Sequence, residues 1–261
     1  MHNKVTVIIP TRNREKLLMD RAVSSVEKQT FQGFEQIVID DDSDLPPAIE
    51  CVINIGRKGL SFNRNLGAIL AKTEYIVHLD DDNMLEPNHL EETVKFLDDH
   101  PEYDAVGVGK TVVYPEGKMY QPPPEGDYFA MNDGFLIRRK AFLDIQCDED
   151  LNANEDADFG LHFLKKYKVG RIDKPLMTVW GSAIINRSSF SDYTDYHLEG
   201  LVKFWLKNRN DLPEKDNHYY KRMIGRMFIL STDRPRWFRP IYWLEQKIKR
   251  YFTIWLSHVH R

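Results

Sequence analysis

Cysteine is scarce in this sequence, and long hydrophobic runs are absent from it. The two cysteines, Cys51 and Cys147, are too few and too far apart to indicate a disulfide framework or a zinc cluster, which fits a reducing cytosol. No stretch approaches the roughly 18 apolar residues of a membrane-spanning helix, and the run at residues 5–9 is too short for the apolar region of a signal peptide. We therefore expect a cytoplasmic protein that is neither exported by such a peptide nor embedded in a membrane.

The sequence also lacks an excess of positive charge. Its 36 lysines and arginines are outnumbered by 40 acidic residues, so the formal net charge of -4 gives no overall attraction to nucleic acid. Hydrophobic residues make up 42% of the 261 residues, which is enough to bury a full core. We expect a globular protein of one large domain or two small ones, without internal repeats.

Three consecutive acidic residues, Asp80, Asp81 and Asp82, follow a short apolar run at residues 75–79. Side chains alternate along an extended strand, so the pattern predicts that Asp80 and Asp82 point one way and Asp81 the other. Two convergent carboxylates suit a hard divalent cation, which completes its coordination with water and substrate phosphates. A solvated acidic turn is the simpler alternative.

Strands alternate with helices in the first half of the chain. Continuous apolar runs are typical of strands buried on both faces, and helical spacing of apolar residues marks the segments between them. This order predicts an α/β fold with a mainly parallel, doubly wound sheet flanked by helices. The expected strands are residues 5–9, 36–39, 51–55 and 75–79, and the expected helices are residues 15–29, 60–72 and a segment from Pro87 to Leu97.

The second half of the chain is less regular. Prolines and glycines between residues 114 and 131 predict a long loop, which either closes over a ligand site or stays a surface loop that does not move. The remainder after residue 180 is expected to be helical, so we expect a main domain over residues 1–185 and a helical C-terminal extension over residues 186–261. Further strands are expected at residues 105–113, 135–137 and 177–180, and a helix at residues 154–166.

Polar residues follow several of these strands. Open parallel sheets bind ligands beyond the carboxyl ends of their strands, where the strand order reverses. Pro10, Thr11 and Arg12 follow the first strand, and Asp40 and Asp41 follow the second, so the three strand ends are expected to share one crevice with the acidic run. The pair at residues 40–41 is also a common turn-former or helix cap.

An arginine on the expected helix at residues 60–72 has two interpretations. Arg64 is by default a solvated helix residue, but a guanidinium that reaches the crevice pairs well with phosphate oxygens.

Five motifs resemble one known family. In order and approximate spacing they are similar to the inverting family 2 glycosyltransferases, nucleotide-sugar enzymes of the GT-A fold, over residues 4–180. The motifs are Val-Ile-Ile-Pro-Thr-Arg-Asn-Arg at residues 7–14, Gln-Thr-Phe at 29–31, Ile-Val-Ile-Asp-Asp-Asp-Ser at 37–43, Arg-Asn-Leu-Gly at 64–67 and Leu-Asp-Asp-Asp-Asn at 79–83.

The resemblance implies a set of donor-binding residues and a metal ligand. Asp41 would accept a hydrogen bond from the uracil imide N–H with Thr11 beside the base, and Asp80 would approach the ribose or a phosphate. Asp82 would ligate a Mn²⁺ or Mg²⁺ ion bound to the diphosphate. The donor-binding residues implied are Pro10, Thr11, Arg12, Asp41, Arg64, Asp80 and Asp81.

The family also has a glycine-containing segment on the acceptor side and a late acidic pair. Asp133 and Gly134 match the first, and Glu155 with Asp156 matches the second. An inverting transfer needs a base near the attacking hydroxyl, and Asp156 is the expected base, with like charges at Glu155 and Asp158 raising at least one pKa. The alternative is that Asn154 caps the helix and the acids complement its dipole.

Some residues depart from the family's pattern. Asp42 stands where a glycine is usual, and Gly181 follows Trp180 where many GT-A enzymes have a metal-binding histidine. His197 is a substitute ligand or an ordinary surface or core residue. The Gln-x-x-Arg-Trp motif of processive synthases is absent, which favours single-sugar addition.

The resemblance therefore implies transfer of one hexosyl or N-acetylhexosaminyl group from a nucleotide-diphospho-sugar, expected to be a UDP-sugar, to an acceptor hydroxyl. The acceptor would be a carbohydrate or a lipid-linked glycan in surface glycan or polysaccharide assembly. A nucleotidyltransferase of related fold is an alternative, although residues 10–14 lack the glycines of a phosphate loop. A catalytically silent nucleotide-binding or scaffold protein is a second alternative, against which Glu155 and Asp156 argue.

Basic and apolar residues alternate near the C-terminus. Residues 241–259 have one apolar helical face with aromatic side chains beside cationic ones. Such a helix suits the interface of an anionic membrane, so peripheral contact with the cytoplasmic membrane face is one expectation. Packing on its own domain or on a second subunit in a homodimer is the alternative.

Overall fold

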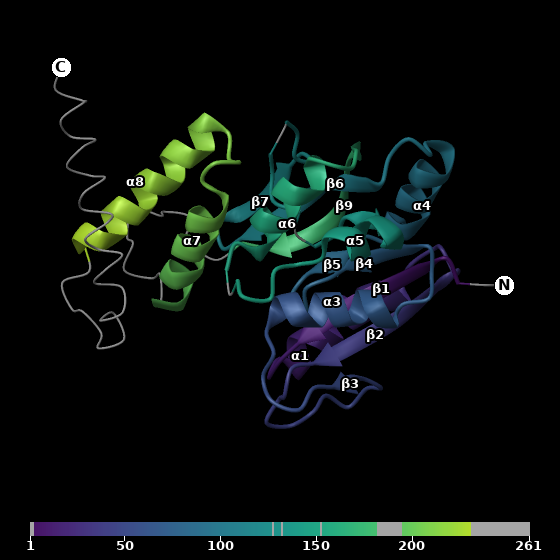
Figure 1. Ribbon diagram of the computed structural model, residues 1–261. Coiled ribbons are helices and arrows are strands. Elements are labelled where there is room, and N and C mark those ends of the chain that lie inside the picture. The colour runs from purple at the N-terminus through teal and green to yellow at the C-terminus, as the bar shows by residue number, and fades with distance from the viewer. Residues whose placement is uncertain (1–2, 127, 132, 152, 182–194, 231–261) are drawn as a thin grey trace, which may run out of the picture. The chain divides into compact units, whose positions relative to one another are not determined.

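The computed structural model describes residues 3–126, 128–131, 133–151, 153–181 and 195–230 (Figure 1). The chain divides into two compact units, residues 1–221 and residues 222–261. The boundary expected at residue 185 lies outside the described residues. The strands are β1 (Val5–Thr11), β2 (Phe34–Asp40), β3 (Val52–Ile53), β4 (Tyr75–His78), β5 (Met84–Leu85), β6 (Ala105–Tyr114), β7 (Gly117–Gln121), β8 (Leu136–Arg138) and β9 (Val169–Trp180).

Helices follow most of these strands. Together, α1, η1 and α2 make one continuous helical segment, in which η1 is a π-helical stretch. The helices are α1 (Glu15–Leu17), η1 (Leu18–Val23), α2 (Ser24–Glu27), α3 (Leu60–Leu70), α4 (His89–Asp99), α5 (Arg139–Ile145), α6 (Glu155–Leu164), α7 (Asp195–Asn208) and α8 (Glu214–Leu230).

The strands form one mixed sheet, nine-stranded within the described residues. Its order is β3-β2-β1-β4-β8-β6-β9-β5, and β7 pairs with β6. β3, β2, β1 and β4 are parallel, and β9 is parallel to β6, whereas β8 is antiparallel to both of its neighbours. The chain builds outward from β1 through β2 to β3 and then returns to place β4 on the other side of β1. The strand order therefore reverses between β1 and β4, which is where such sheets bind ligands.

Successive residues of β1 face two different helical layers. Val7 and Ile9 pack with Leu18, Val26 and Leu90, so η1, α2 and α4 cover one face of the sheet. On the other face, Ile8 packs in a cluster whose helical members come from α3, α5 and α6. Those members are Ala68, Ala141, Phe142, Phe159 and Phe163. Both faces are covered, which confirms the doubly wound α/β architecture and explains why the run at residues 5–9 is continuously apolar.

A glycine allows α3 to lie against β1. A Cβ atom on Gly67 would be 2.3 Å from Cγ2 of Ile8 and 3.2 Å from Cδ1 of Ile39. Only a residue without a side chain fits at that crossing, which is the physical reason for the glycine that ends the Arg-Asn-Leu-Gly motif. One turn earlier on the same helix, Arg64 reaches the acidic residues that follow β4.

The structure corrects two local predictions. The segment at residues 114–131 is not all loop, because a two-residue turn lets β7 pair with β6 from Tyr114 opposite Gly117 to Lys110 opposite Gln121. The helix expected to begin at Pro87 begins at His89, because Pro87 turns its carbonyl away to accept a hydrogen bond from Thr30 N–H at 2.8 Å.

The C-terminal extension is helical over α7 and α8, as the sequence predicts. Residues 241–259, in which the amphipathic helix was expected, lie outside the described part of the chain. Among the helices that are described, none has the length and apolar character needed to cross a membrane.

Candidate active site

The carboxyl ends of β1, β2 and β4 meet at the point where the strand order reverses. Asp41 N–H donates to the Thr11 carbonyl at 2.9 Å, which joins the ends of β1 and β2. The Thr11 hydroxyl donates to Oδ2 of Asp81 at 2.8 Å, which joins the end of β1 to the acidic turn after β4. Pro10 is buried in β1. Arg12 is the first residue after that strand, and its Nε atom is buried with no partner among the described residues. The structure therefore brings the three predicted strand ends together.

Asp41 is a buried carboxylate that anchors the segment leading into α3. It accepts hydrogen bonds from the backbone N–H groups of Lys58 at 2.8 Å and Gly59 at 3.0 Å. Burial favours the neutral acid, but these hydrogen bonds outweigh it and hold the pKa of Asp41 below its ordinary value. Gly59 has φ +94°, which a side chain rarely tolerates. Asp40 forms a turn instead, because its carboxylate accepts from the N–H and hydroxyl groups of Ser43.

The acidic turn after β4 is arranged differently from the alternation that the sequence predicts. β4 ends at His78, so the residues after it leave the extended geometry in which side chains alternate. Asp81 does not point away from the site, because it accepts hydrogen bonds from Thr11 and Arg14. Asp80 turns instead toward α3 and pairs with Arg64.

Two arginines from the segment after β1 hold Asp82. Nη1 of Arg14 lies 3.0 Å from Oδ2 of Asp82 and 3.1 Å from Oδ1 of Asp81. Arg21 donates to the backbone carbonyl of Asp82 at 2.8 Å, and its guanidinium lies 3.8 Å from the ring centre of Trp180. No role was predicted for Arg14, the last residue of the motif at residues 7–14, and Arg21 belongs to no motif.

The site offers few protein ligands for a metal ion. In the part of the chain that the structure describes, no group of three or more histidine, cysteine, aspartate or glutamate side chains is arranged to hold one. The side chain of His197 lies outside that part. Asp82 presents a 39% exposed carboxylate, and a hard cation held by one or two carboxylates with the remaining ligands from phosphates and water is the usual arrangement for Mg²⁺. The oxygen donors present therefore fit a cation that arrives with a diphosphate.

Arg64 is a buried bridge and not a solvated helix arginine. Its side chain is 5% exposed, and its two terminal nitrogens each lie 3.0 Å from a carboxylate, Oδ1 of Asp80 and Oε1 of Glu155. Burial opposes the charge, but the two carboxylates raise the pKa of Arg64 above its ordinary value. Its Nε atom is buried with no partner among the described residues. One guanidinium thus links α3, the acidic turn and the first residue of α6.

The acidic pair lies in the first turn of α6. Burial raises the pKa of Glu155, the charge of Arg64 opposes this rise, and Asp156 adds to it. Asp156 is half-buried, and its carboxylate accepts a hydrogen bond from Ala157 N–H at 2.8 Å. Asn154 has φ +62° and makes no capping hydrogen bond with its side chain, so the capping alternative is wrong for that residue. Arg64 therefore engages Glu155 and leaves Asp156 the freer carboxylate.

Asp133 and Gly134 lie deep beside the end of β4. Asp133 accepts from Nδ2 of Asn83 at 2.7 Å, and its Oδ1 atom lies 3.6 Å from Nζ of Lys110. Burial and the nearby charge of Asp80 raise the pKa of Asp133 to about 6, against the attraction of Lys110. Gly134 has φ +83° and donates its N–H to the His78 carbonyl at 2.9 Å. Sequence reasoning missed Lys110, whose position in a β-strand carries no functional pattern.

The segment at residues 128–131 packs against the helix that carries Asp156. Met131 N–H donates to the Asp156 carbonyl at 3.0 Å, and a Cβ atom on Gly160 would be 2.0 Å from the Phe129 carbonyl oxygen. The hydroxyl groups of Tyr128 and Tyr220 lie 3.2 Å apart. The end of the predicted loop is thus attached to α6, and the two tyrosines beside it were not found from the sequence, since they are 92 residues apart.

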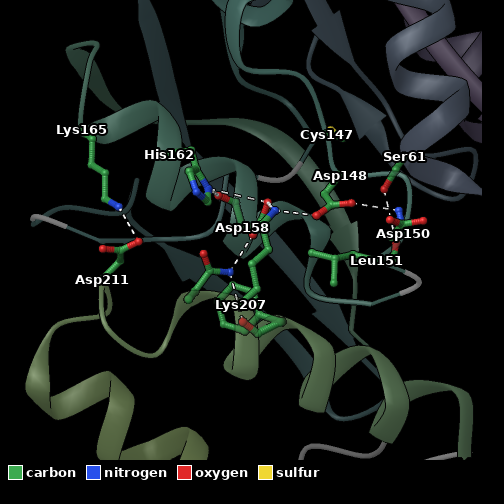
Figure 2. A network of polar contacts seen from close by, with 12 residues as sticks. Ser61, Cys147, Asp148, Asp150, Leu151, Asp158, His162, Lys165, Lys207 and Asp211 are labelled. Carbon is green, nitrogen blue, oxygen red and sulfur yellow. Dashed lines mark hydrogen bonds and ion pairs between the residues drawn. The ribbon is translucent and has the colours of Figure 1, made fainter.

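A polar network attaches α6 to α7 and to the segment before α6 (Figure 2). The buried carboxylate of Asp158 accepts from Lys207 at 2.9 Å and from Asn208 at 2.7 Å. Figure 2 shows Lys207 reaching both Asp158 and Asp148, which it contacts at 2.5 Å. The adjacent Cys147 carbonyl accepts from Asn65 of α3 at 2.9 Å. Asp158 therefore holds the C-terminal helix α7 to α6 and is not a third free acid of the site.

A family model and several known proteins are similar in sequence to this chain. A family model described as Glycosyl transferase family 2 matches residues 6–153. An uncharacterized glycosyltransferase of Haemophilus influenzae is 27% identical over 237 residues, which are 79% of this chain and 80% of that protein. The succinoglycan biosynthesis protein ExoW of Rhizobium meliloti is 33% identical over 101 residues, which are 33% of this chain and 32% of that protein.

Solved structures match over most of the chain. The crystal structure of S. aureus TarS 1-349 in complex with UDP-GlcNAc has a TM-score of 0.59 at 19% identity and covers 90% of this chain and 75% of that one. The two proteins therefore share a fold.

Proposed function

The chain belongs to glycosyl transferase family 2, and from this membership we propose that it moves one sugar from a UDP-sugar to an acceptor hydroxyl with inversion at the anomeric carbon. It is a glycosyltransferase of the GT-A fold, as its motifs predicted. The observation that carries the proposal is the bridge of Arg64, which ties Glu155 at the start of α6 to Asp80 in the acidic turn. This bridge places the acidic pair next to the crevice in which the donor would bind.

The donor is proposed to bind at the carboxyl ends of β1, β2 and β4. Asp41, held ionised by its backbone hydrogen bonds, would accept from the uracil imide N–H beside Thr11. TarS, which shares the fold, was solved with UDP-GlcNAc, and this supports a uridine nucleotide and an N-acetylhexosaminyl or hexosyl group. Arg64, both of whose terminal nitrogens already contact carboxylates, would act on the donor by orienting Asp80. The proposed donor residues are Pro10, Thr11, Arg12, Asp41, Arg64, Asp80 and Asp81.

Asp82 is proposed to hold a Mn²⁺ or Mg²⁺ ion. When bound, such an ion neutralises charge that develops on a departing diphosphate. Asp82 is suited to it as the most exposed carboxylate of the turn, at 39%, and Arg21 fixes the backbone of the same residue.

Asp156 is proposed as the base that accepts the proton of the attacking hydroxyl. Arg64 holds Glu155 at 3.0 Å, so Glu155 is committed to positioning, while Asp156 is half-buried at the start of the helix. General bases of this kind typically contribute about 10²- to 10⁴-fold to a rate. Asp133 and Gly134 would shape the acceptor side next to the end of β4.

The acceptor is proposed to be a carbohydrate or lipid-linked glycan used in polysaccharide assembly. ExoW, which is similar over a third of the chain, is described as a succinoglycan biosynthesis protein. Addition of a single sugar is proposed because the sequence lacks the Gln-x-x-Arg-Trp motif of processive synthases. Residues 241–259 would then bring the enzyme to an anionic membrane that carries such acceptors.

A panel of UDP-, GDP-, CDP- and dTDP-sugars tests the donor, with thermal unfolding measured with and without Mn²⁺. We expect UDP-sugars with Mn²⁺ to raise the melting temperature most, since a ligand that binds only the folded state stabilises it by mass action. With glycan acceptors present, transfer of the sugar would release UDP, whereas transfer of the uridylyl group of the same UDP-sugar by a nucleotidyltransferase would release a sugar 1-phosphate. Stabilisation by another nucleotide class, or sugar 1-phosphate as product, would contradict the proposal.

Association with membranes is tested by sedimentation with anionic vesicles at low salt. The full chain should co-sediment, and truncation after Asp233 should remove this binding while sparing UDP binding. A full-length protein that stays in the supernatant would favour a helix packed on protein.

A further inference from the structure

Arg14 is the most exposed of the three arginines that hold the acidic turn after β4. Its side chain is 53% exposed, and a single nitrogen, Nη1, lies 3.1 Å from Oδ1 of Asp81 and 3.0 Å from Oδ2 of Asp82. One positive charge is therefore shared between two adjacent carboxylates. No other arginine or lysine forms a salt bridge with either carboxylate within the described part of the chain.

The other two arginines are fixed in a way that Arg14 is not. Arg64 is 5% exposed and is held by two carboxylates on different elements. Arg21 donates to the backbone carbonyl of Asp82 and lies against the Trp180 ring, so it does not depend on the Asp82 side chain. Of the three, only Arg14 has a mostly exposed side chain. To leave the turn, it would give up one contact with the 39% exposed Asp82 and one with Asp81, which is 7% exposed.

A divalent cation at Asp82 would lie next to this guanidinium, which already contacts Oδ2 of the carboxylate. Both would carry positive charge within a few ångströms of each other, and repulsion at such distances is strong even at the surface of a protein. A freed guanidinium has a planar set of donors that matches phosphate oxygens. The diphosphate of a bound donor would supply those oxygens next to the same turn.

Resting on the proposed donor and metal sites, we propose that Arg14 competes with the divalent cation for Asp82 and passes to the diphosphate when the donor binds. Arg14 then makes the binding of the cation and of the nucleotide mutually dependent. The cation alone has to displace Arg14 without compensation, whereas the cation with a diphosphate releases it to a new partner. The coupling is reciprocal, so each ligand raises the affinity for the other by the same factor.

The test is calorimetric titration of Mn²⁺ into the full-length protein, with and without saturating UDP. In the absence of UDP, Arg14→Gln should bind Mn²⁺ about tenfold more tightly than wild type, because a guanidinium that is 53% exposed no longer occupies the Asp82 carboxylate. With UDP present the advantage should vanish, so the factor by which UDP improves Mn²⁺ affinity should fall about tenfold. Lys16→Gln removes the same charge from a neighbouring side chain that is 89% exposed and pairs with Asp20, so it should behave as wild type.

Arg14→Lys is a second variant that keeps the charge. A single ammonium cannot reproduce the planar set of donors, so its coupling factor should lie between those of wild type and Arg14→Gln. Weaker Mn²⁺ binding by Arg14→Gln without UDP, or an unchanged coupling factor, would overturn the proposal while leaving the donor and metal assignments standing. If wild type binds UDP but no Mn²⁺ under either condition, the metal assignment fails and the role of Arg14 fails with it.

Discussion

Replacing Arg64 with methionine tests the bridge on which the proposed site depends. The substitution keeps an unbranched side chain that can fill the space of the apolar stem, but it leaves Asp80 and Glu155 without their shared cation. Removing one partner of a buried ion pair costs about 3–5 kcal/mol. Asp80 is 32% exposed, so water can solvate it in part, whereas Glu155 is 12% exposed. We therefore expect Arg64→Met to lower the free energy of unfolding by about 3 kcal/mol at pH 8, near the lower limit of that range.

The loss of unfolding free energy in Arg64→Met should depend on pH. The pKa of Glu155 is already raised by burial, and removing Arg64 would raise it further. A carboxyl group whose folded pKa exceeds its unfolded pKa holds its proton more tightly in the folded state. Its destabilising effect therefore appears as the pH rises from the unfolded towards the folded value, and is complete above the folded value. The difference between wild type and Arg64→Met should be larger at pH 8 than at pH 5.

Urea unfolding at both pH values measures this loss. Arg57→Met is the control, because Arg57 is an exposed arginine in the segment before α3 and should change the unfolding free energy by less than about 0.5 kcal/mol. A loss below about 1 kcal/mol for Arg64→Met, or the same loss at pH 5 and pH 8, would refute the claim that Arg64 is a buried bridge.

Three further substitutions separate the proposed roles. Asp156→Asn should lower the transfer rate about 10²- to 10⁴-fold while calorimetry shows unchanged UDP affinity; an equal loss of UDP affinity would move Asp156 into the donor site. Asp41→Ala should raise the donor KM by an amount equivalent to about 1–3 kcal/mol, and an unchanged preference for uridine would count against its role. The wild-type melting temperature should fall relative to that of Asp133→Asn as the pH rises from about 4 to about 6, because folding raises the pKa of Asp133 from 3.8 to about 6. A variant with the wild-type pH profile would show that another group titrates.

The strands that the sequence predicts best are those buried on both faces. β1 and β4 are continuous apolar runs because strands on both sides and two helical layers bury all of their residues, and β2 is buried in the same way over its last three residues. β5 and β7 were not foreseen. β5 has only two residues, and β7 is fully exposed, so neither has a hydrophobic pattern that predicts a strand. Each forms because it pairs with a neighbouring strand, β5 with β9 and β7 with β6.

The orientation of the acidic residues shows a second limit of prediction from the sequence. Alternation along β4 predicted that Asp81 faces away from the site, yet it contacts Thr11 and Arg14. The rule fails at this point because it holds only while the backbone stays extended, and β4 ends at His78. Which carboxylate of a three-residue run faces which neighbour depends on the turn and not on the count of residues.

The sequence by itself determined the architecture, the family and the acidic residues at the strand ends, because strand and helix periods are local and the motifs have a characteristic order. Only the tertiary structure decided how the charges pair. Arg64 reaches Glu155, 91 residues away, and Arg14 reaches Asp81, 67 residues away. No local pattern encodes contacts between residues so far apart in the sequence. These contacts form because separate strands end at the same edge of the sheet and because a glycine at residue 67 lets α3 approach β1. Burial then selects the pairing, because a charge removed from water is stable only beside an opposite charge.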